Sequence, residues 1–378
     1  MVPAIVAKMR LIVCDKGGRE ERVSGVSEGN AARDFFYGTD QLCESEFVIT
    51  RECVRSSYKG IKGQIIQRYE SIISRCTGLG MRPYLAKNIV NKLQSHDLAI
   101  SFTDGFSLTL GYVHKENLKI RSKLVGCFHR LCDIEESAPN FFKKYIRKRI
   151  KSALSRLDHV AFFGPADREE AIKRYKIPKE KTSDFILGID SGFWKPTGEP
   201  EEDYFFSIGQ DPQRDFQLLV NLDTDHPIRI QTPLNLIIPK NKKNIILNDG
   251  NYYKSHLSDI QLRSLYCRAK AIVLPLRDVL QPTGYSVMLQ AMSCAKPVII
   301  TFNRGFWARD KMTSGKDCIF VRPNNERDLR DAICFLDTNR ELRHKIGETA
   351  RKTILNSFPI TKSADSIKTI IQKLGKDL

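Results

Sequence analysis

Short apolar runs alternate along the chain with longer stretches in which apolar positions recur every three or four residues. The short runs have the length and the Val, Ile and Phe content of buried strands, and the longer stretches have the spacing of amphipathic helices. The strand-like runs are MRLIVC, EFVIT, HDLAISF, SKLVGCF, HVAFFG, SDFILG, YFFSIG, RIQ, NIILN, AIVLPL, PVIIT and CIFV. Strands separated by helices at such distances predict parallel sheets covered by helices, which is an α/β fold.

This alternation begins again near Tyr204, after a segment rich in Gly, Pro and acidic residues. The segment spans Asp190–Asp203, and its composition is typical of an exposed linker. We therefore predict two consecutive α/β domains, residues 1–190 and residues 204–359. A final stretch with helical spacing, about 360–378, predicts a C-terminal helix.

Length and composition narrow the class of protein further. A chain of 378 residues suits two domains, and no apolar stretch approaches the roughly 20 residues that a membrane-spanning helix needs. Lys8 and Arg10 interrupt what would be the apolar core of a signal peptide. The ten cysteines form no Cys-x-x-Cys pair, and several fall in apolar runs. We therefore expect reduced cysteines, no zinc site and a cytoplasmic protein.

Positive charge is concentrated in the first half of the chain. The net charge is +17, and residues 51–160 hold 21 cations against 9 anions. Within them, Phe141–Leu157 reads FFKKYIRKRIKSALSRL, a basic stretch with helical spacing. It is compatible with a surface helix packed on the sheet and with contact to an anionic membrane surface. We expect no nucleic acid partner, because the charge comes with no nucleic-acid-binding motif.

The segment Ala271–Thr301 is the strongest candidate for chemistry. Its pattern is strand, loop, helix and strand, and the loop ends in the small and polar run PTGYS at 282–286. Small residues at the start of a helix leave backbone N–H groups available for a phosphate. In open α/β sheets, ligands bind at the carboxyl ends of strands, where this loop falls. An ordinary strand-to-helix turn would have the same spacing.

The same segment resembles the donor-binding motif of the family 4 retaining glycosyltransferases. That motif ends in Glu-Ala-Met-Ala-x-Gly-x-Pro-Val-Ile, and residues 290–299 read QAMSCAKPVI. GIDSGFWKP at the linker and VGCFHR at 125–130 are similar to two further motifs of that family. The likeness covers nearly the whole chain and is most specific over residues 271–323.

The resemblance implies the GT-B fold, in which two Rossmann-like domains face each other across a cleft. It implies that the first domain is the acceptor side, that the second binds the nucleotide sugar, and that the C-terminal helix crosses back onto the first. The implied activity is a hexosyltransferase that moves a sugar from a nucleotide-diphosphate donor to a glycan or lipid-linked acceptor, with retention and without metal or cofactor. The resemblance further implies a role in polysaccharide biosynthesis. The corresponding location is the cytoplasm, at the inner face of the membrane.

The resemblance also assigns roles to individual residues. His129, which follows the strand-like run SKLVGCF, is the catalytic candidate through contact with the donor sugar. The residues expected to bind the donor are Gly18, Gly209, Gln210, Arg214, Thr283, Gly284, Tyr285, Ser286 and Gln290. Arg214 is expected at the diphosphate and Gln290 at the ribose, although a solvated loop charge is the alternative for Arg214.

Two positions depart from the family pattern of two glutamates separated by seven residues. Gln290 stands at the second position and Pro282 at the first, with Gln281 one residue out of register. A glutamine can still hydrogen-bond a diol, but it loses the charge-assisted bond of a carboxylate. Two alternatives therefore stay open: a non-catalytic GT-B protein that binds an anion or nucleotide, and a sugar-nucleotide 2-epimerase.

Overall fold

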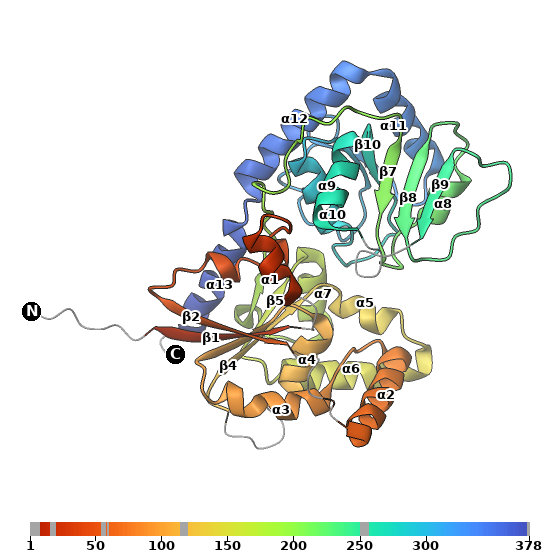
Figure 1. Cartoon of the computed structure of the whole chain (residues 1–378). Coiled ribbons are helices and arrows are strands. Elements are labelled where there is room, and N and C mark those ends of the chain that lie inside the picture. Colours follow the sequence, from red (N-terminus) through yellow and green to blue (C-terminus); the bar gives the residue numbers. More distant parts are fainter. Residues whose placement is uncertain are drawn as a thin grey trace, which may run out of the picture. The chain divides into compact units, whose positions relative to one another are not determined.

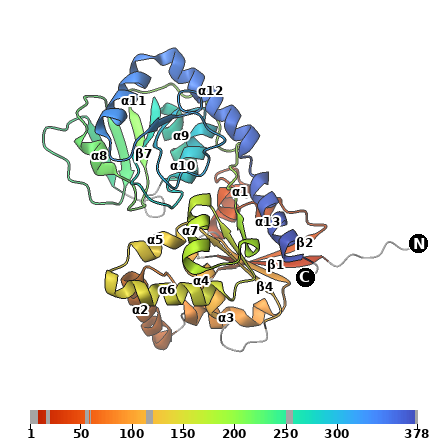
Figure 2. The ribbon, with the colours of Figure 1, turned by 180° about the vertical axis from the view of Figure 1, so that it is seen from behind.

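The structure is a computed structural model, and it describes residues 8–15, 20–53, 58, 60–113, 120–249 and 257–375. The chain divides into two compact units. Unit 1 comprises residues 1–24, 35–186 and 363–378, and unit 2 comprises residues 25–34 and 187–362. Each unit holds one six-stranded sheet flanked by helices, as the opposite views in Figure 1 and Figure 2 show.

The sheet of unit 1 is parallel and has the strand order β2-β1-β3-β4-β5-β6. Its strands are β1 Met9–Asp15, β2 Phe47–Cys53, β3 Leu98–Ser101, β4 Lys123–Phe128, β5 His159–Phe162 and β6 Thr182–Asp184. Its helices are α2 Gly60–Thr77, α3 Pro83–Leu93, α4 Asp104–Val113, α5 Leu131–Glu136, α6 Asn140–Leu154, α7 Pro165–Tyr175, the first part of α1 Glu20–Ser27 and most of α13 Thr361–Leu374. The inner strands β3 and β5 are buried at every position, and three of the four residues in each are apolar.

The sheet of unit 2 is also parallel, with the order β12-β11-β10-β7-β8-β9. Its strands are β7 Phe205–Ile208, β8 Ile228–Thr232, β9 Ile245–Asp249, β10 Ala271–Leu274, β11 Val298–Thr301 and β12 Ile319–Val321. Its helices are α8 Phe216–Asn221, α9 Asp259–Arg268, α10 Tyr285–Ser293, α11 Glu326–Thr338 and α12 Arg340–Ser357. The predicted α/β class with two Rossmann-like domains is confirmed, and each of the twelve strand-like runs overlaps a strand. The cleft between the domains stays a prediction.

The boundaries of the units differ in detail from the predicted domains. Contacts divide the chain between Ile186 and Leu187, and the predicted linker lies wholly in unit 2. Residues 25–34 also belong to unit 2, although they come between β1 and β2 of unit 1. The sequence does not indicate this exchange, because the short segment carries no strand or long helix of its own.

The C-terminal helix α13 attaches to unit 1 through its side chains. Ser366 accepts a hydrogen bond from the backbone N–H of Ile186 at 3.0 Å, and Lys373 donates to the carbonyl of Thr182 at 3.0 Å. Ile367 and Ile370 on the same helix are buried. Within the described residues, no helix is long and apolar enough to span a bilayer.

The basic stretch at 141–157 forms most of α6, and its apolar side is part of the core. Ile146, Ile150 and Leu154 are buried, at the spacing that the sequence shows. The structure ends the helix at Leu154, three residues before the predicted end. The cations Lys144, Lys148 and Arg149 are exposed, so α6 presents a basic face to solvent.

Candidate functional site

Two loops meet at the carboxyl ends of β7 and β10 in unit 2. The loop after β7 is Gly209–Asp215 and the loop after β10 is Pro275–Gly284. Their backbones pair: Asp215 N–H donates to the Pro275 carbonyl at 2.8 Å, and Arg277 N–H donates to the Gln213 carbonyl at 2.9 Å. Because β7 and β10 are neighbours in a parallel sheet, their following loops leave the same edge and can join there.

The carboxylate of Asp211 ties the two loops together through side chains. It accepts hydrogen bonds from the amide of Gln281, from Thr283 Oγ1 at 3.2 Å and from the backbone N–H of Gln213 at 2.9 Å. The bond to Asp211 places Thr283 beside the first loop. Sequence reasoning did not reveal that Asp211 joins the two loops, because Gln281 and Thr283 lie about 70 residues away along the chain.

Arg214 occupies the centre of this junction. Its side chain is only 7% exposed, and it passes directly over two glycines. A Cβ on Gly209 would lie 2.6 Å from Arg214 Nε, and a Cβ on Gly284 would lie 3.1 Å from Arg214 Nη1. These two glycines leave the space that the guanidinium fills, so a larger residue at either position would displace it.

The guanidinium of Arg214 is buried without a full set of partners. Its Nε and Nη1 donate no hydrogen bond to any part of the chain that the structure describes. Burial lowers the pKa of Arg214 to about 10, although the nearby Asp211 acts in the opposite direction. Since that pKa lies well above neutrality, the side chain stays a cation. A buried cation with unpaired donors costs free energy unless an anion satisfies it, so the position is suited to an anionic ligand.

The start of α10 lies against the same guanidinium. Gly284 is the N-cap residue with φ of 81°, and within the described chain no side chain caps the helix there. The first-turn N–H groups of Ser286 and Val287 thus belong to a helix start without a side-chain cap, which carries partial positive charge. Tyr285 is held in place by its ring contact with Trp307, with ring centroids 3.9 Å apart. The helix start and Arg214 together form a compact site for negative charge.

Replacing Gly209 by alanine tests how tightly the loop holds Arg214. The new Cβ would come within 2.6 Å of Nε, which forces the buried guanidinium out of place. We expect the affinity for a nucleoside diphosphate to fall about tenfold in calorimetric titrations, with a stability loss of about 1–3 kcal/mol from overpacking. Gly192→Ala is the matched control, because its Cβ would meet only Asp190 Oδ1, at 3.3 Å. Equal affinity in the two variants would contradict the placement of the anion site.

Gln290 lies farther along α10, and both ends of its amide contact protein groups. Its Oε1 accepts from the hydroxyl of Tyr266 at 3.3 Å, and its Nε2 donates to Asp34 Oδ2 at 3.1 Å. The side chain is 3% exposed. The predicted contact of Gln290 with a ribose stays a prediction, and the structure adds that the amide stabilises a buried polar network.

Asp34 is the centre of that network, and sequence reasoning missed it. Its carboxylate accepts hydrogen bonds from the backbone N–H of Asp190 at 2.7 Å and from the indole of Trp194 at 2.6 Å, in addition to Gln290. Burial raises the pKa of Asp34 to about 7, against the lowering effect of these three hydrogen bonds. The network therefore fixes residues 25–34, the linker and α10 to one another inside unit 2.

His129 follows β4 in unit 1 as predicted, and it has several protein contacts. Its Nε2 lies 3.0 Å from the carbonyl oxygen of Phe102, so this nitrogen carries the proton in that hydrogen bond. Its ring stacks on Phe163 with centroids 3.9 Å apart and planes at 7°. The backbone N–H of His129 donates to Asp104 Oδ1 at 3.1 Å. These contacts fix the orientation of the ring, and its contact with a donor sugar stays a prediction.

The remaining predicted residues are placed as follows. Gln210 is exposed beside Gly209, and Ser286 is half-buried in the first turn of α10. Gly18 lies outside the described residues. In the described ranges, no group of three or more His, Cys, Asp or Glu side chains is arranged to hold a metal ion. The expected absence of metal and cofactor stays a prediction.

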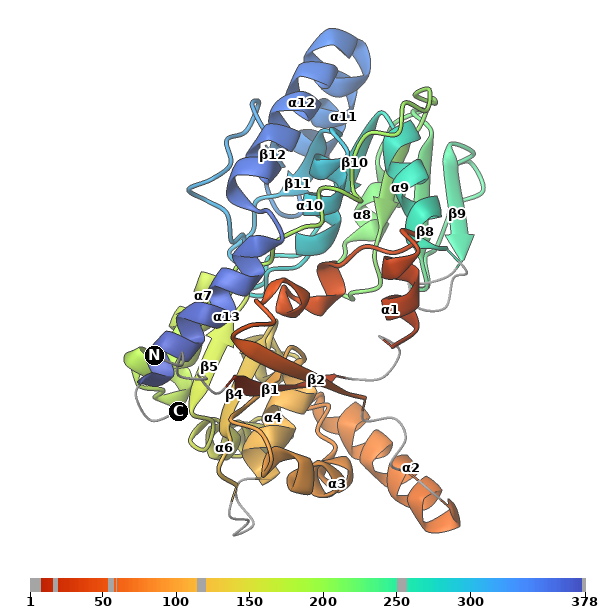
Figure 3. The ribbon, with the colours of Figure 1, turned by 60° about the vertical axis from the view of Figure 1, so that its left-hand side comes forward.

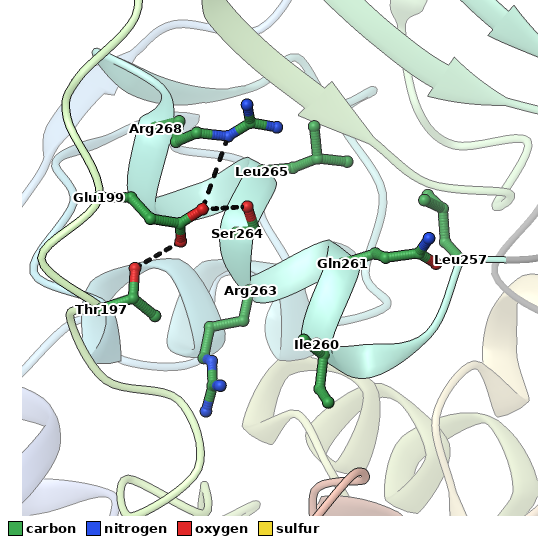
Figure 4. A pocket seen from close by; sticks show the side chains of 9 residues that line it. All are labelled: Thr197, Glu199, Leu257, Ile260, Gln261, Arg263, Ser264, Leu265 and Arg268. Atoms are coloured by element: carbon green, nitrogen blue, oxygen red, sulfur yellow. Dashed lines mark hydrogen bonds and ion pairs between the residues drawn. The ribbon is translucent and has the colours of Figure 1, made fainter.

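A separate pocket of about 550 Å³ lies between α9 and the linker (Figure 4). Glu199 accepts hydrogen bonds there from Ser264 at 2.6 Å and from Thr197 at 2.5 Å, and lies 3.9 Å from Arg268 Nε. The Nε atoms of Arg263 and Arg268 are buried without a hydrogen-bond partner in the described chain, as Nε of Arg214 is. The junction at Arg214 differs because an uncapped helix start lies against the guanidinium.

The fold and this site define a two-domain α/β protein of the GT-B architecture. Residues 240–353, which contain β10, the second loop and α10, match the family profile described as Glycosyl transferases group 1. No curated protein sequence matches the chain. The matched segment and the fold together support a glycosyltransferase.

Solved structures with the same fold resemble nearly the whole chain. HepE of Anabaena in complex with UDP has a TM-score of 0.64 at 11% identity, covering 96% of this chain and 99% of that one. Sucrose-phosphate synthase of Thermosynechococcus elongatus has a TM-score of 0.65 at 12% identity, with coverage of 97% and 99%. The lipopolysaccharide outer core galactosyltransferase WaaB in its apo form has a TM-score of 0.56 at 13% identity, with coverage of 96% and 99%.

Proposed function

We propose that this protein transfers a sugar from a nucleoside-diphosphate sugar to an acceptor. The observation that carries the proposal is the buried guanidinium of Arg214, whose Nε and Nη1 lack partners in the described chain while it lies against the uncapped start of α10. A diphosphate supplies the negative charge and the several acceptor oxygens that such a site requires. HepE, a protein of the same fold, has been crystallised with UDP and with UDP-glucose.

In this proposal, catalysis is mainly electrostatic. When the bond between sugar and diphosphate breaks, negative charge grows on the departing phosphate oxygens. Arg214 and the N–H groups at the start of α10 are already oriented, so they stabilise that charge without reorganising. Asp211 contributes indirectly, because its bonds to Gln281 and Thr283 hold the two loops in register.

The finer features of the proposal come from the resemblance of residues 290–299 to the family 4 motif. They are hexosyl transfer, retention of the anomeric configuration, and a glycan or lipid-linked acceptor of polysaccharide biosynthesis. The exposed cations of α6, among them Lys144 and Lys148, support an acceptor at the inner face of an anionic membrane.

The proposal is tested by turnover with a panel of nucleotide sugars. The purified protein is incubated with UDP-glucose, GDP-mannose or ADP-glucose, with and without a lipid and glycan extract, and released nucleoside diphosphate is measured. We expect one donor to be consumed faster when the extract is present, and Arg214→Met to reduce the rate. Binding of a nucleoside diphosphate without turnover would instead favour the non-catalytic alternative. Appearance of the epimeric nucleotide sugar without acceptor would favour the 2-epimerase.

A further inference from the structure

Helix α2 of unit 1 exposes a continuous apolar stripe. Its members are Ile61 (79% exposed), Ile65 (62%), Tyr69 (65%), Ile72 (60%) and Ile73 (38%). Their spacing of three and four residues places them on one side of the helix, over about 18 Å at 1.5 Å per residue. Scattered exposed apolar residues are ordinary, but a contiguous stripe of isoleucines indicates an interaction site.

The opposite side of α2, which faces unit 1, is small and polar. Its buried residues are Gly63, Glu70 and Thr77, seven residues apart. A Cβ on Gly63 would lie 2.6 Å from the backbone of Tyr58, so the helix approaches the chain closely there. Glu70 accepts hydrogen bonds from the backbone N–H of Tyr84 at 2.8 Å and from the hydroxyl of Tyr58. The usual orientation of an amphipathic surface helix is therefore reversed, and α2 projects from unit 1 (Figure 3).

The charges on α2 indicate what covers the stripe. Its acidic residue, Glu70, is buried, whereas Lys62, Arg68 and Arg75 are exposed. At 100° per residue, Arg68 and Arg75 border one edge of the stripe and Lys62 lies at the other. The exposed surface of α2 is thus apolar in the middle and cationic at its margins.

We propose that α2 docks this protein on an anionic lipid bilayer, with the isoleucine stripe in the headgroup region and the three cations at the lipid phosphates. Apolar insertion and attraction to anionic lipid are the two contributions that hold such helices at a membrane surface. A second copy of the chain is a poorer occupant, because pairing two α2 helices would bring like charges together in a protein of net charge +17. The inference deepens the proposed function, and it rests on the membrane-side acceptor proposed there. Vesicle binding requires neither donor nor turnover, so the inference and the proposed transfer reaction can fail separately.

Helix α6 differs from α2 in the amount of apolar surface that it exposes for insertion. Its isoleucines Ile146 and Ile150 are buried in unit 1, and its exposed face combines cations with two aromatic side chains, Phe141 (78% exposed) and Tyr145 (43%). It can add electrostatic attraction, but it exposes two large apolar side chains where α2 exposes a stripe of five. This contrast provides a matched control on the same unit.

Co-sedimentation with vesicles tests the inference. Wild type is mixed with phosphatidylglycerol–phosphatidylcholine vesicles or with pure phosphatidylcholine vesicles, at low and at high salt. We expect binding to the anionic vesicles that weakens with salt, and at least a tenfold loss in Ile65→Asn/Ile72→Asn. Lys144→Gln/Lys148→Gln on α6 should retain binding within about threefold. Because Ile65 and Ile72 are exposed, both proteins should unfold at the same temperature as wild type.

A reporter distinguishes insertion from loose adsorption. The two native tryptophans, Trp194 and Trp307, are buried, whereas Ile72 is exposed. Ile72→Trp therefore introduces a single solvent-exposed tryptophan on the stripe. Its fluorescence should shift to the blue on anionic vesicles and be quenched by brominated lipid. Unchanged binding in Ile65→Asn/Ile72→Asn, loss of binding only in the α6 variant, equal binding to neutral vesicles, or a change in oligomeric state on Ile65→Asn/Ile72→Asn would each overturn the inference.

Discussion

Replacing Arg214 by methionine should weaken the binding of a nucleoside diphosphate by about 10- to 150-fold, the equivalent of about 1.5–3 kcal/mol for a charged hydrogen bond. Methionine keeps much of the buried volume but removes the cation over Gly209 and Gly284. Arg214→Lys should give an intermediate affinity, since a lysine keeps the charge but loses the planar fork of donors. Calorimetric titration of the three proteins measures the effect.

The same substitution should not destabilise the unliganded protein. The Nε and Nη1 atoms of Arg214 are buried without partners in the described part of the chain. Removing them therefore removes a desolvation cost from the folded protein without nucleotide. We expect Arg214→Met to unfold at the wild-type temperature or above it. A clear loss of stability together with unchanged nucleotide affinity would show that the guanidinium is structural and that the anion site lies elsewhere.

Asp34→Ala should lower the free energy of unfolding of unit 2 by about 3–5 kcal/mol, because three buried neutral donors lose their acceptor and each unpaired donor costs about 1–3 kcal/mol. It leaves the N–H of Asp190, the indole of Trp194 and the amide of Gln290 without their shared acceptor. Urea unfolding followed by tryptophan fluorescence measures the loss, because Trp194 is in direct contact with Asp34. Asp40→Ala, an exposed aspartate, serves as the control.

The pH dependence of stability gives a second test of Asp34. Burial raises the pKa of Asp34 from its ordinary value of 3.8 to about 7, so the folded state binds a proton more tightly than the unfolded state. Protonation of Asp34 therefore contributes to the free energy of unfolding. This contribution is greatest below about pH 4 and decreases as the pH rises toward 7, by at most about 4 kcal/mol.

Other described groups also titrate near this range, so a difference between variants is required. Burial raises the pKa of Asp167 to about 7, with an effect of the same sign, and lowers the pKa of His159 to about 4, with the opposite effect. Hydrogen bonding with Cys294 lowers the pKa of Cys267 to about 6. The free energy of unfolding is measured against pH for wild type and for Asp34→Asn. The difference between the two profiles gives the contribution of Asp34 to the pH dependence. Parallel profiles between pH 4 and pH 7 would contradict a raised pKa at this position.

The sheets could be predicted because buried parallel strands leave a clear pattern. Strand β10 is covered on both faces, so every position is apolar and the run stands out between polar helices. The pattern could not reveal that residues 25–34 join unit 2. That assignment depends on the contacts of Asp34 with residues more than 150 positions away.

The site was predictable in part for the same reason. Arg214, Thr283 and Gly284 follow neighbouring parallel strands, and loops at that edge of a sheet meet in space. The roles of Asp211 and Asp34 were not predictable, since a single carboxylate in a loop has no periodicity. For α2, helical spacing indicates an apolar side but does not reveal whether that side faces the core or the solvent. Only the structure shows that it is exposed.

The most direct test of the account compares a nucleoside diphosphate with its monophosphate, in wild type and in Arg214→Met, by calorimetric titration. If Arg214 and the start of α10 bind the diphosphate, wild type should prefer the diphosphate by at least about tenfold, and Arg214→Met should lose most of that preference. The same preference in both proteins, or no binding of either nucleotide to wild type, would contradict the assignment of a nucleotide-sugar site at this junction.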